Sequence, residues 1–366
     1  IMLHTQRLAL CPDTARKGAL PRVHVAWIFL GILTCLGQPG WARAQQAVDA
    51  STLDQKLIWG YQGWFSHPSV DQGSGYGWRT WSRDAGVPNA DTISVDFWPD
   101  TSEFTAAEKY ATSMTLPNGS PAYLYSAANY STVLRHFQWM RDYGIDGVNV
   151  QRFVNLFKYV PGFYNKVLQN IRQAAEATGR TFFVQYDISQ QQNNPSLVPD
   201  TQNDWNAIKS ITSSPSYQRH GGKPVIGIWG LAFQQAGPSP TEGQQLVDFF
   251  RAQNLTLFGG VPSTNDRLSG YNGVIRQFDI LSPWYVGRFG DSNADAYLSA
   301  QLAADKAEAD AAGRAFCPVL WPGFSWYNNS RGGGALNARP RYGGRFMWKQ
   351  AYRMLSRGDI RMIYGA

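Results

Sequence analysis

The feature that most constrains this fold is a repeated alternation of short apolar runs with longer amphipathic stretches. From Leu57 onward, eight runs have the length and the β-branched or aromatic content of buried strands. They span residues 57–65, 146–153, 181–189, 223–230, 255–262, 278–284, 315–324 and 359–365. Five intervening stretches carry apolar residues three and four positions apart and often stop at a glycine, as helices do. They span residues 131–144, 162–179, 241–253, 293–313 and 343–358.

Eight strands with interleaved helices in roughly 310 residues predict an α/β fold, a (β/α)8 TIM barrel formed by one domain over residues 45–366. A doubly wound open sheet is the alternative, but the glycine fingerprint that such sheets use for phosphates is absent after the first strand. Residues 66–130 are too many for an ordinary loop, and they include a possible extra strand at 122–127. Long ordered loops at strand ends are usually functional.

Residues 1–44 have the pattern of a secretory signal peptide. A basic region precedes the apolar stretch "VAWIFLGILTCLG", and Ala42 and Ala44 form a small-residue site that predicts cleavage between Ala44 and Gln45. An apolar stretch of about 13 residues is too short for a comfortable membrane span. We therefore expect a secreted or periplasmic protein with no membrane association after cleavage. Lipid attachment at Cys35 is the alternative for this segment.

The charge balance and the cysteines of the chain exclude several classes of partner. The leader holds five basic residues and one acid, so its removal lowers the net charge from +7 to +3, which does not indicate a nucleic-acid partner. Of the three cysteines only Cys317 remains, which predicts neither a disulfide framework nor a cysteine-based metal site. Scattered histidines give no metal signature either, so we expect no metal and no cofactor. The oligomeric state stays open.

Aromatic and polar residues gather at the carboxyl ends of the predicted strands and in the loops that follow them. Aromatic residues make up 14% of the chain, while charged residues make up only 16%. In a parallel barrel the carboxyl ends of the strands surround one mouth, so these residues predict an aromatic cleft for a neutral, hydroxyl-rich ligand. The predicted substrate-binding residues are Tyr61, Trp64, Trp98, Asp100, Arg152, Tyr186, Asp187, Trp229, Trp284, Arg288 and Trp326.

Carboxylates are the side chains that hydrolyse glycosidic bonds, since one donates a proton and another attacks or activates water. Asp187 lies at a strand end, where it either takes part in catalysis or fixes the following loop. Asp96, Asp100 and Glu103 in "DFWPDTSEF" either line the cleft or form a rigid turn. Arg152 lies in an apolar strand and needs a partner if buried, either an acid such as Asp187 or a substrate oxygen.

Two further residues, His136 and Ser325, do not indicate a catalytic role. His136 lies among aromatic residues of a predicted helix, so we expect it to be packed rather than to act as a base. Ser325 lacks the Gly-x-Ser-x-Gly elbow of serine hydrolases, which argues against that class.

Eight motifs together carry a family resemblance that spans nearly all of residues 55–366. They are "GYQGWF", "DFWPDTSEF", "HFQWMRDYGIDGVNVQRF", "QYDIS", "KPVIGIWGLAF", "SPWYVGRF", "PGFSWYN" and "PRYGGRFMWKQ". With them the chain resembles secreted bacterial proteins of the xylosidase/arabinosidase type, which look like relatives of the endo-α-mannosidases of glycoside hydrolase family 99. The resemblance implies a glycosidase barrel and a carbohydrate substrate. The residues that it carries over as cleft residues are Tyr61, Trp64, Asp187, Trp229 and Trp284.

The same resemblance places the catalytic pair outside this sequence. In the group that the chain resembles, the last strand runs into a segment of the type Phe-Asp-Glu-Val-Asp-Glu-Gly-Thr, and in family 99 the matching Glu-x-x-Glu supplies the catalytic carboxylates. The resemblance thus implies that the catalytic residues lie beyond Ala366 and that the chain is a fragment, truncated after the eighth strand without the last loop and helix.

The sequence therefore favours an exported glycoside hydrolase-like protein that acts on a neutral polysaccharide or glycan, in a copy that lacks the catalytic pair. A non-catalytic carbohydrate-binding barrel is the first alternative. A second alternative pairs Asp187 with Asp100 or Glu103 as an internal set of catalytic acids. The sugar, its linkage and the retaining or inverting outcome stay open.

Overall fold

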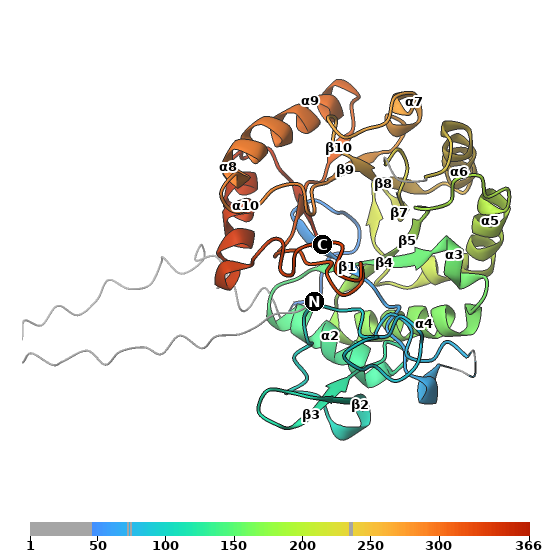
Figure 1. The fold of residues 1–366 in the computed structure, drawn as a ribbon. Coiled ribbons are helices and arrows are strands. Elements are labelled where there is room, and N and C mark those ends of the chain that lie inside the picture. Colours follow the sequence, from blue (N-terminus) through green and yellow to red (C-terminus); the bar gives the residue numbers. More distant parts are fainter. Residues whose placement is uncertain (1–45, 72, 74, 234–236) are drawn as a thin grey trace, which may run out of the picture.

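The computed structural model describes residues 46–71, 73, 75–233 and 237–366, so the predicted signal peptide and its cleavage point lie outside the described residues. The described chain has an α/β fold, in which helices surround a curled, parallel, TIM-like sheet (Figure 1). The parallel strands of this sheet are β1 (Lys56–Tyr61), β4 (Gly147–Phe153), β5 (Thr181–Asp187), β7 (Lys223–Trp229), β8 (Thr256–Pro262), β9 (Ile280–Trp284), β10 (Ala315–Phe316), β11 (Val319–Leu320) and β12 (Met362–Gly365), and a short strand, β6 (Arg219–His220), pairs antiparallel with β7. The α/β class and the TIM-like sheet predicted from the alternation are confirmed.

All eight predicted strands lie in this sheet, in the neighbour order β10-β9-β8-β7-β5-β4-β1-β12-β11. The seventh predicted strand is split, because only Cys317 and Pro318 separate β10 from β11. Its first half pairs with β9, since Cys317 N donates to Leu281 O at 2.9 Å. Its second half pairs with β12, since Tyr364 N donates to Pro318 O at 3.0 Å. The two ends of the strand order therefore meet in one short segment.

Helices cover the outer face of the sheet, and the five predicted helical stretches are all helical in the structure. The longer helices are α2 (Tyr130–Asp142), α4 (Pro161–Thr178), α5 (Leu197–Ile208), α6 (Pro240–Ala252), α9 (Ala303–Ala311) and α10 (Arg345–Leu355). The short ones are α3 (Val154–Phe157), α7 (Asn272–Ile275) and α8 (Ala294–Tyr297), and a π-helical turn at Leu298–Leu302 joins α8 to α9. The sequence did not predict α5, whose segment contains Pro199; a proline is tolerated there because it lies in the first turn.

The segment that precedes β1 is hydrogen-bonded to Gly179, just before β5, and to the short strand β6. Val48 N donates to Gly179 O at 2.8 Å, and Arg219 N donates to Ala50 O at 2.7 Å. Arg180 is buried and donates to the carbonyl groups of Gly179, Ile145 and Gln46, which satisfies a guanidinium that has left water. The segment before β1 is therefore held against the amino end of β5 by hydrogen bonds.

The long segment between β1 and α2 forms a small unit of its own. Its strands β2 (Tyr110–Thr115) and β3 (Pro121–Leu124) pair antiparallel, away from the main sheet (Figure 1). The predicted extra strand is thus confirmed. The segment has a separate core formed by Trp78, Trp81, Ile93 and Leu124. Across the described part of the chain, no helix is both long and apolar enough to cross a membrane.

Candidate functional site

The parallel register of the sheet separates the residues at the carboxyl ends into two faces. Phe153, Asp187 and Trp229 are register partners on β4, β5 and β7, so their side chains point to the same side of the sheet. That side is the interior, because Phe258 of β8, the register partner of Gly227 on this face, meets the ring of Tyr364 from the distant strand β12, with 6.1 Å between ring centroids. On the same face Gln185 accepts a hydrogen bond from Asn149 Nδ2 at 2.7 Å. The neighbours Arg152 and Tyr186 have the opposite parity and face the helices.

Three of the predicted residues lie together at the inner carboxyl ends, and we call them the tip cluster (Asp187, Trp229 and Trp284). The rings of Trp229 and Trp284 are 5.1 Å apart in an edge-to-face arrangement. Trp229 lies across Gly260, where any Cβ would meet its ring, so the glycine of β8 leaves the space that this ring occupies. Within the described chain, Trp229 Nε1 is buried and has no hydrogen-bond acceptor.

Asp187 is the acid of the tip cluster, and its side chain is only 4% exposed. Burial raises the pKa of this carboxyl to about 6, against hydrogen bonds from Ser189 N at 2.9 Å and Ser189 Oγ at 2.6 Å that favour the charged form. Among the described residues no cation contributes to this shift of the pKa. A carboxyl group with such a pKa can accept or donate a proton near neutral pH.

Below the tip cluster the interior of the sheet is polar, which the sequence analysis missed. Asn149, Gln151 and Gln185 are buried inside strands that are otherwise apolar. The sequence contains a pattern that indicates this polar interior. Asn149 and Gln151 are two residues apart, as are Gln185 and Asp187. In a strand this spacing puts both members of each pair on one face. Tyr364 enters the same interior across Gly60, where a Cβ would meet its hydroxyl group.

Two of the predicted site residues form a different set on the helix-facing side, which we call the outer polar set (Arg152, Tyr186 and Asp204). Arg152 is 1% exposed and donates two hydrogen bonds to the Asp204 carboxylate of α5, at 2.5 and 2.9 Å. The Tyr186 hydroxyl donates to the same carboxylate at 2.7 Å. The expectation that a buried Arg152 needs an ion-pair partner is confirmed, but the suggested partner Asp187 is wrong, because strand alternation turns the two side chains to opposite faces.

Tyr61 also faces a helix. Its hydroxyl group forms a hydrogen bond of 2.9 Å with Nδ1 of His136 on α2, and both side chains are buried. Burial lowers the pKa of His136 to about 3, so this histidine is neutral at physiological pH. The interpretation of His136 as a packed residue is confirmed. The structure therefore does not bring Tyr61, Arg152 or Tyr186 to the inner face that holds the tip cluster.

The other predicted residues are distributed over the loops at the same end of the sheet. The Trp64 ring packs on Phe153, with 4.8 Å between ring centroids, which places it beside the row of Asp187. Arg288, in the loop after β9, forms an ion pair with Asp266 at 3.3 Å. Trp326 lies in the loop after β11 and is 54% exposed.

The motif "DFWPDTSEF" is held within the long segment and against α2. Trp98 Nε1 donates to Tyr123 O at 2.9 Å, and Asp100 accepts a hydrogen bond from Ser102 N at 2.9 Å. Glu103 accepts from Trp139 Nε1 of α2 at 2.8 Å, so its carboxylate is bound to a helix that covers the outer face. These contacts favour the interpretation of the motif as a rigid turn, and its pairing with Asp187 as catalytic acids stays a prediction.

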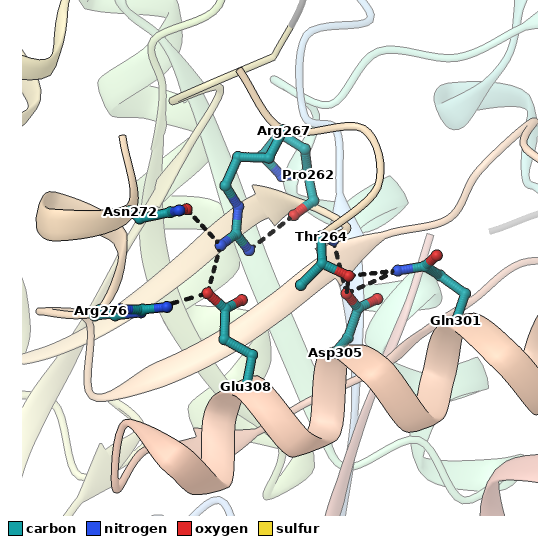
Figure 2. A network of polar contacts seen from close by, with 8 residues as sticks. All are labelled: Pro262, Thr264, Arg267, Asn272, Arg276, Gln301, Asp305 and Glu308. Carbon is teal, nitrogen blue, oxygen red and sulfur yellow. Dashed lines mark hydrogen bonds and ion pairs between the residues drawn. The ribbon is translucent and has the colours of Figure 1, made fainter. Parts of the chain in front are cut away.

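A buried polar network braces the loop after β8 against α9 (Figure 2). Asp305 accepts hydrogen bonds from Thr264 N at 2.7 Å and from Gln301 Nε2 at 3.0 Å. Arg267 donates to Glu308 at 2.7 Å. Gln301 belongs to the π-helical turn, which thus points an amide into the network. The network fixes the loop that carries Asp266, the partner of Arg288. Among the described residues, no group of three or more His, Cys, Asp and Glu side chains is placed to hold a metal ion.

Comparisons with known proteins identify the fold but no sequence relative. No protein-family model and no curated protein sequence matches the chain. Two structures of the family 99 endo-α-mannosidase from Bacteroides thetaiotaomicron match at 15% and 14% sequence identity, with TM-scores of 0.56 and 0.57. Each match covers 86% of this chain, and 83% and 84% of the respective enzyme chain. The chain therefore has a glycoside hydrolase-like fold.

A third structure, described as a glycoside hydrolase-like protein, has 13% identity and a TM-score of 0.51, and it covers 90% of this chain and 86% of its own. The resemblance to family 99 that the sequence motifs implied is thus confirmed as a structural similarity. At these identities the similarity shows the glycoside hydrolase-like fold, and the roles of individual residues stay predictions.

Proposed function

We propose that this protein is a glycoside hydrolase-like protein whose tip cluster binds a neutral polysaccharide or glycan. The observation that carries the proposal is the meeting of Asp187 with Trp229 and Trp284 on the inner carboxyl ends of β5, β7 and β9. Glycosidase barrels work at this end of the sheet, and the fold is one that they use.

The chemistry of the tip cluster suits a sugar. Flat indole rings stack on the apolar faces of pyranose rings, while a carboxyl group and a buried indole N–H bind hydroxyl groups. The absence of a cationic contribution to the pKa of Asp187 among the described residues favours an uncharged ligand over an anionic one. A pKa of about 6 also lets Asp187 exchange a proton with a ligand near neutral pH.

Calorimetric titration with α-mannan, arabinan and xylan fragments tests the proposal. We expect at least one of these to bind, and we expect Trp284→Ala to weaken that binding strongly because the substitution removes a stacking surface. Tyr61→Phe is the matched control, since Tyr61 faces α2 and its substitution leaves the tip cluster intact. If none of these glycans binds while a non-carbohydrate substrate is turned over, the proposal is wrong.

Release of reducing sugar from the same glycans separates hydrolysis from binding alone. Binding without release favours the alternative of a non-catalytic carbohydrate-binding barrel. Release that is lost in Asp187→Asn favours Asp187 as a catalytic acid.

Export is a second part of the proposal, supported by the basic, apolar and small-residue regions of residues 1–44. An exported protein would meet polysaccharides that lie outside the cytoplasm. Expression of the full sequence followed by amino-terminal sequencing of the exported protein tests this part. We expect the mature chain to begin at Gln45, whereas an uncleaved protein that stays in the cytoplasm would contradict export.

A further inference from the structure

The loops after β1 and after β11 are cross-linked by a clamp of hydrogen bonds. Asp96, in the long segment, accepts hydrogen bonds from the backbone N–H groups of Tyr327 and Asn328, both at 2.7 Å. Asn328 Nδ2 donates to Val95 O at 2.8 Å, and Arg83 Nη1 donates to Asn328 O at 2.7 Å. A carboxylate with two backbone donors is a strong, charge-assisted contact, so residues 327 and 328 are held in place.

Next to this clamp two aromatic rings lie parallel, and we call them the aromatic platform (Phe324 and Trp326). Their planes differ by 7°, and their centroids are 6.3 Å apart. Phe324 is fixed by paired backbone hydrogen bonds with Arg339, at 2.8 and 2.9 Å. Trp326 nevertheless remains 54% exposed. A large exposed ring contributes little to the core, but on a loop whose backbone is held on both sides it is placed to bind a flat apolar ligand surface.

The aromatic platform is connected to the tip cluster through the loop after β9. Gly287, three residues after Trp284, has a φ of +80°, and a Cβ at this position would lie 3.8 Å from the Phe324 ring. The glycine thus lets the loop turn with Phe324 beside it. Phe324 therefore lies beside the loop that follows Trp284, and the aromatic platform and the tip cluster flank the two ends of the short segment 284–287.

Two of the arginines near the aromatic platform have their guanidinium groups engaged by the backbone. Arg83 and Arg339, which hold this loop, donate to backbone carbonyl groups. Arg83 Nη1 bonds Ile93 O at 2.9 Å, and Arg339 Nε bonds Phe289 O at 2.9 Å. Guanidinium groups engaged in this way are poorly placed to bind a phosphate or a carboxylate.

We propose that the aromatic platform binds a remote sugar unit of an extended neutral oligosaccharide whose other end occupies the tip cluster. This inference rests on the proposed function and adds the length of the ligand to it. Trp326 stacks on the apolar face of the remote sugar unit, and the clamp holds that ring in position before the ligand arrives. The substrate class is therefore a polysaccharide chain rather than a short glycoside.

Calorimetric titration of the full chain with disaccharides and hexasaccharides of the α-manno, arabino and xylo series tests the inference. We expect the hexasaccharide of one series to bind about tenfold more tightly than its disaccharide, as one additional stacking contact implies. Trp326→Ala removes this difference by weakening hexasaccharide binding, and it leaves disaccharide binding unchanged. Trp348→Ala is the control, because Trp348 is a 68% exposed tryptophan on α10 that belongs to neither the aromatic platform nor the tip cluster, and both affinities stay the same.

The outcomes separate this inference from the function on which it rests. Equal affinities for both lengths, or a length difference that survives Trp326→Ala, overturns the inference while the proposed function stands. No binding of either length overturns both. Asp96→Ala supplies a second variant that keeps both rings. We expect it to reduce the length difference by releasing the clamp, and unchanged hexasaccharide affinity in this variant would overturn the role of the clamp.

Discussion

The tip cluster and the outer polar set show two opposite ways of placing polar groups on neighbouring residues. Tyr186 and Asp187 are adjacent in β5, yet one binds Asp204 of α5 and the other lies inside the sheet. In the outer polar set, Arg152 balances the charge of Asp204, and the tyrosine hydroxyl adds a third contact. In the tip cluster, Asp187 is buried with a pKa raised by burial and with no cation contributing from the described residues.

The contrast indicates which polar groups stabilise the fold and which are available to a ligand. A buried ion pair with two charge-assisted hydrogen bonds and a further bond from a tyrosine hydroxyl is consistent with a structural contact between a strand and a helix. A buried carboxyl group without a counter-charge is costly for the fold, and groups of this kind gather at functional sites. Substitutions in the outer polar set should therefore change stability, while those in the tip cluster should change binding and its dependence on pH.

The largest effect is expected for Arg152→Met. The substitution leaves the Asp204 carboxylate buried without its cation, and breaking a buried pair in this way costs about 3 to 5 kcal/mol. Urea unfolding at pH 7 measures the loss of stability. The double variant Arg152→Met with Asp204→Leu is the control, and we expect it to recover most of the loss because no unpaired charge remains. A single variant within about 1 kcal/mol of the native protein would contradict the structural role.

The second effect is a pH-dependent change of stability in Asp187→Asn. The folded pKa of Asp187, about 6, lies above the unfolded value of about 3.8, so the folded state binds more protons than the unfolded state between these values. Stability from this group is therefore greatest below about pH 4 and is lost as the pH rises to about 6. We expect Asp187→Asn to be more stable than the native protein above pH 6, by up to about 3 kcal/mol.

Thermal unfolding of both proteins between pH 4 and pH 8 measures this second effect. The stability difference between them should vanish near pH 4, where the native carboxyl group is protonated. Ser189→Ala sharpens the test, because the Ser189 hydroxyl donates to the carboxylate and lowers the pKa of Asp187, so its removal shifts the pH midpoint upward. A constant difference across this pH range would mean that Asp187 is not a buried, uncompensated acid.

The third effect concerns the buried indole nitrogen of the tip cluster. Trp229→Phe keeps a ring against Trp284 but removes Nε1, which has no acceptor among the described residues. We expect stability to be unchanged, and the affinity for the bound glycan to fall about tenfold, or about 1.4 kcal/mol, as the loss of one hydrogen bond to the ligand implies. Calorimetric titration and thermal unfolding measure the two quantities. A loss of stability with unchanged affinity would place Trp229 with the structural residues.

The sequence predicted the sheet because the strand signal and the helix signal are both local. Apolar runs with β-branched residues marked all eight strands, and periodic stretches ending at glycines such as Gly179 marked the main helices. The helix α5 was missed because Pro199 and its polar neighbours weaken the helical pattern, and its burial depends on contacts with other elements.

The side of the sheet to which each strand-end residue points was harder to predict from the sequence. Strands of a parallel sheet are buried on both sides and lack the alternation that tells the interior from the exterior. The predicted set of site residues therefore combined Arg152 and Tyr186, which face the helices, with Asp187, which faces the interior. The polar residues Asn149 and Gln185 carry the information that was overlooked, since their spacing from Gln151 and Asp187 marks the inner face. The partner of Arg152 depends on how α5 packs, which no local pattern encodes.

The smallest effect is expected for Tyr61→Phe, which tests whether Tyr61 belongs with the structural residues. His136 is neutral at pH 7, because burial lowers its pKa to about 3, so the bond between Tyr61 and His136 joins two neutral groups. Such a bond contributes about 1 kcal/mol to stability, and urea unfolding at pH 7 should show a loss of that size. Glycan affinity should be unchanged, because the ring faces α2. If Tyr61→Phe instead weakens glycan binding and leaves stability intact, Tyr61 is a ligand-binding residue. The division into a ligand-binding inner face and a structural outer face would then fail at β1.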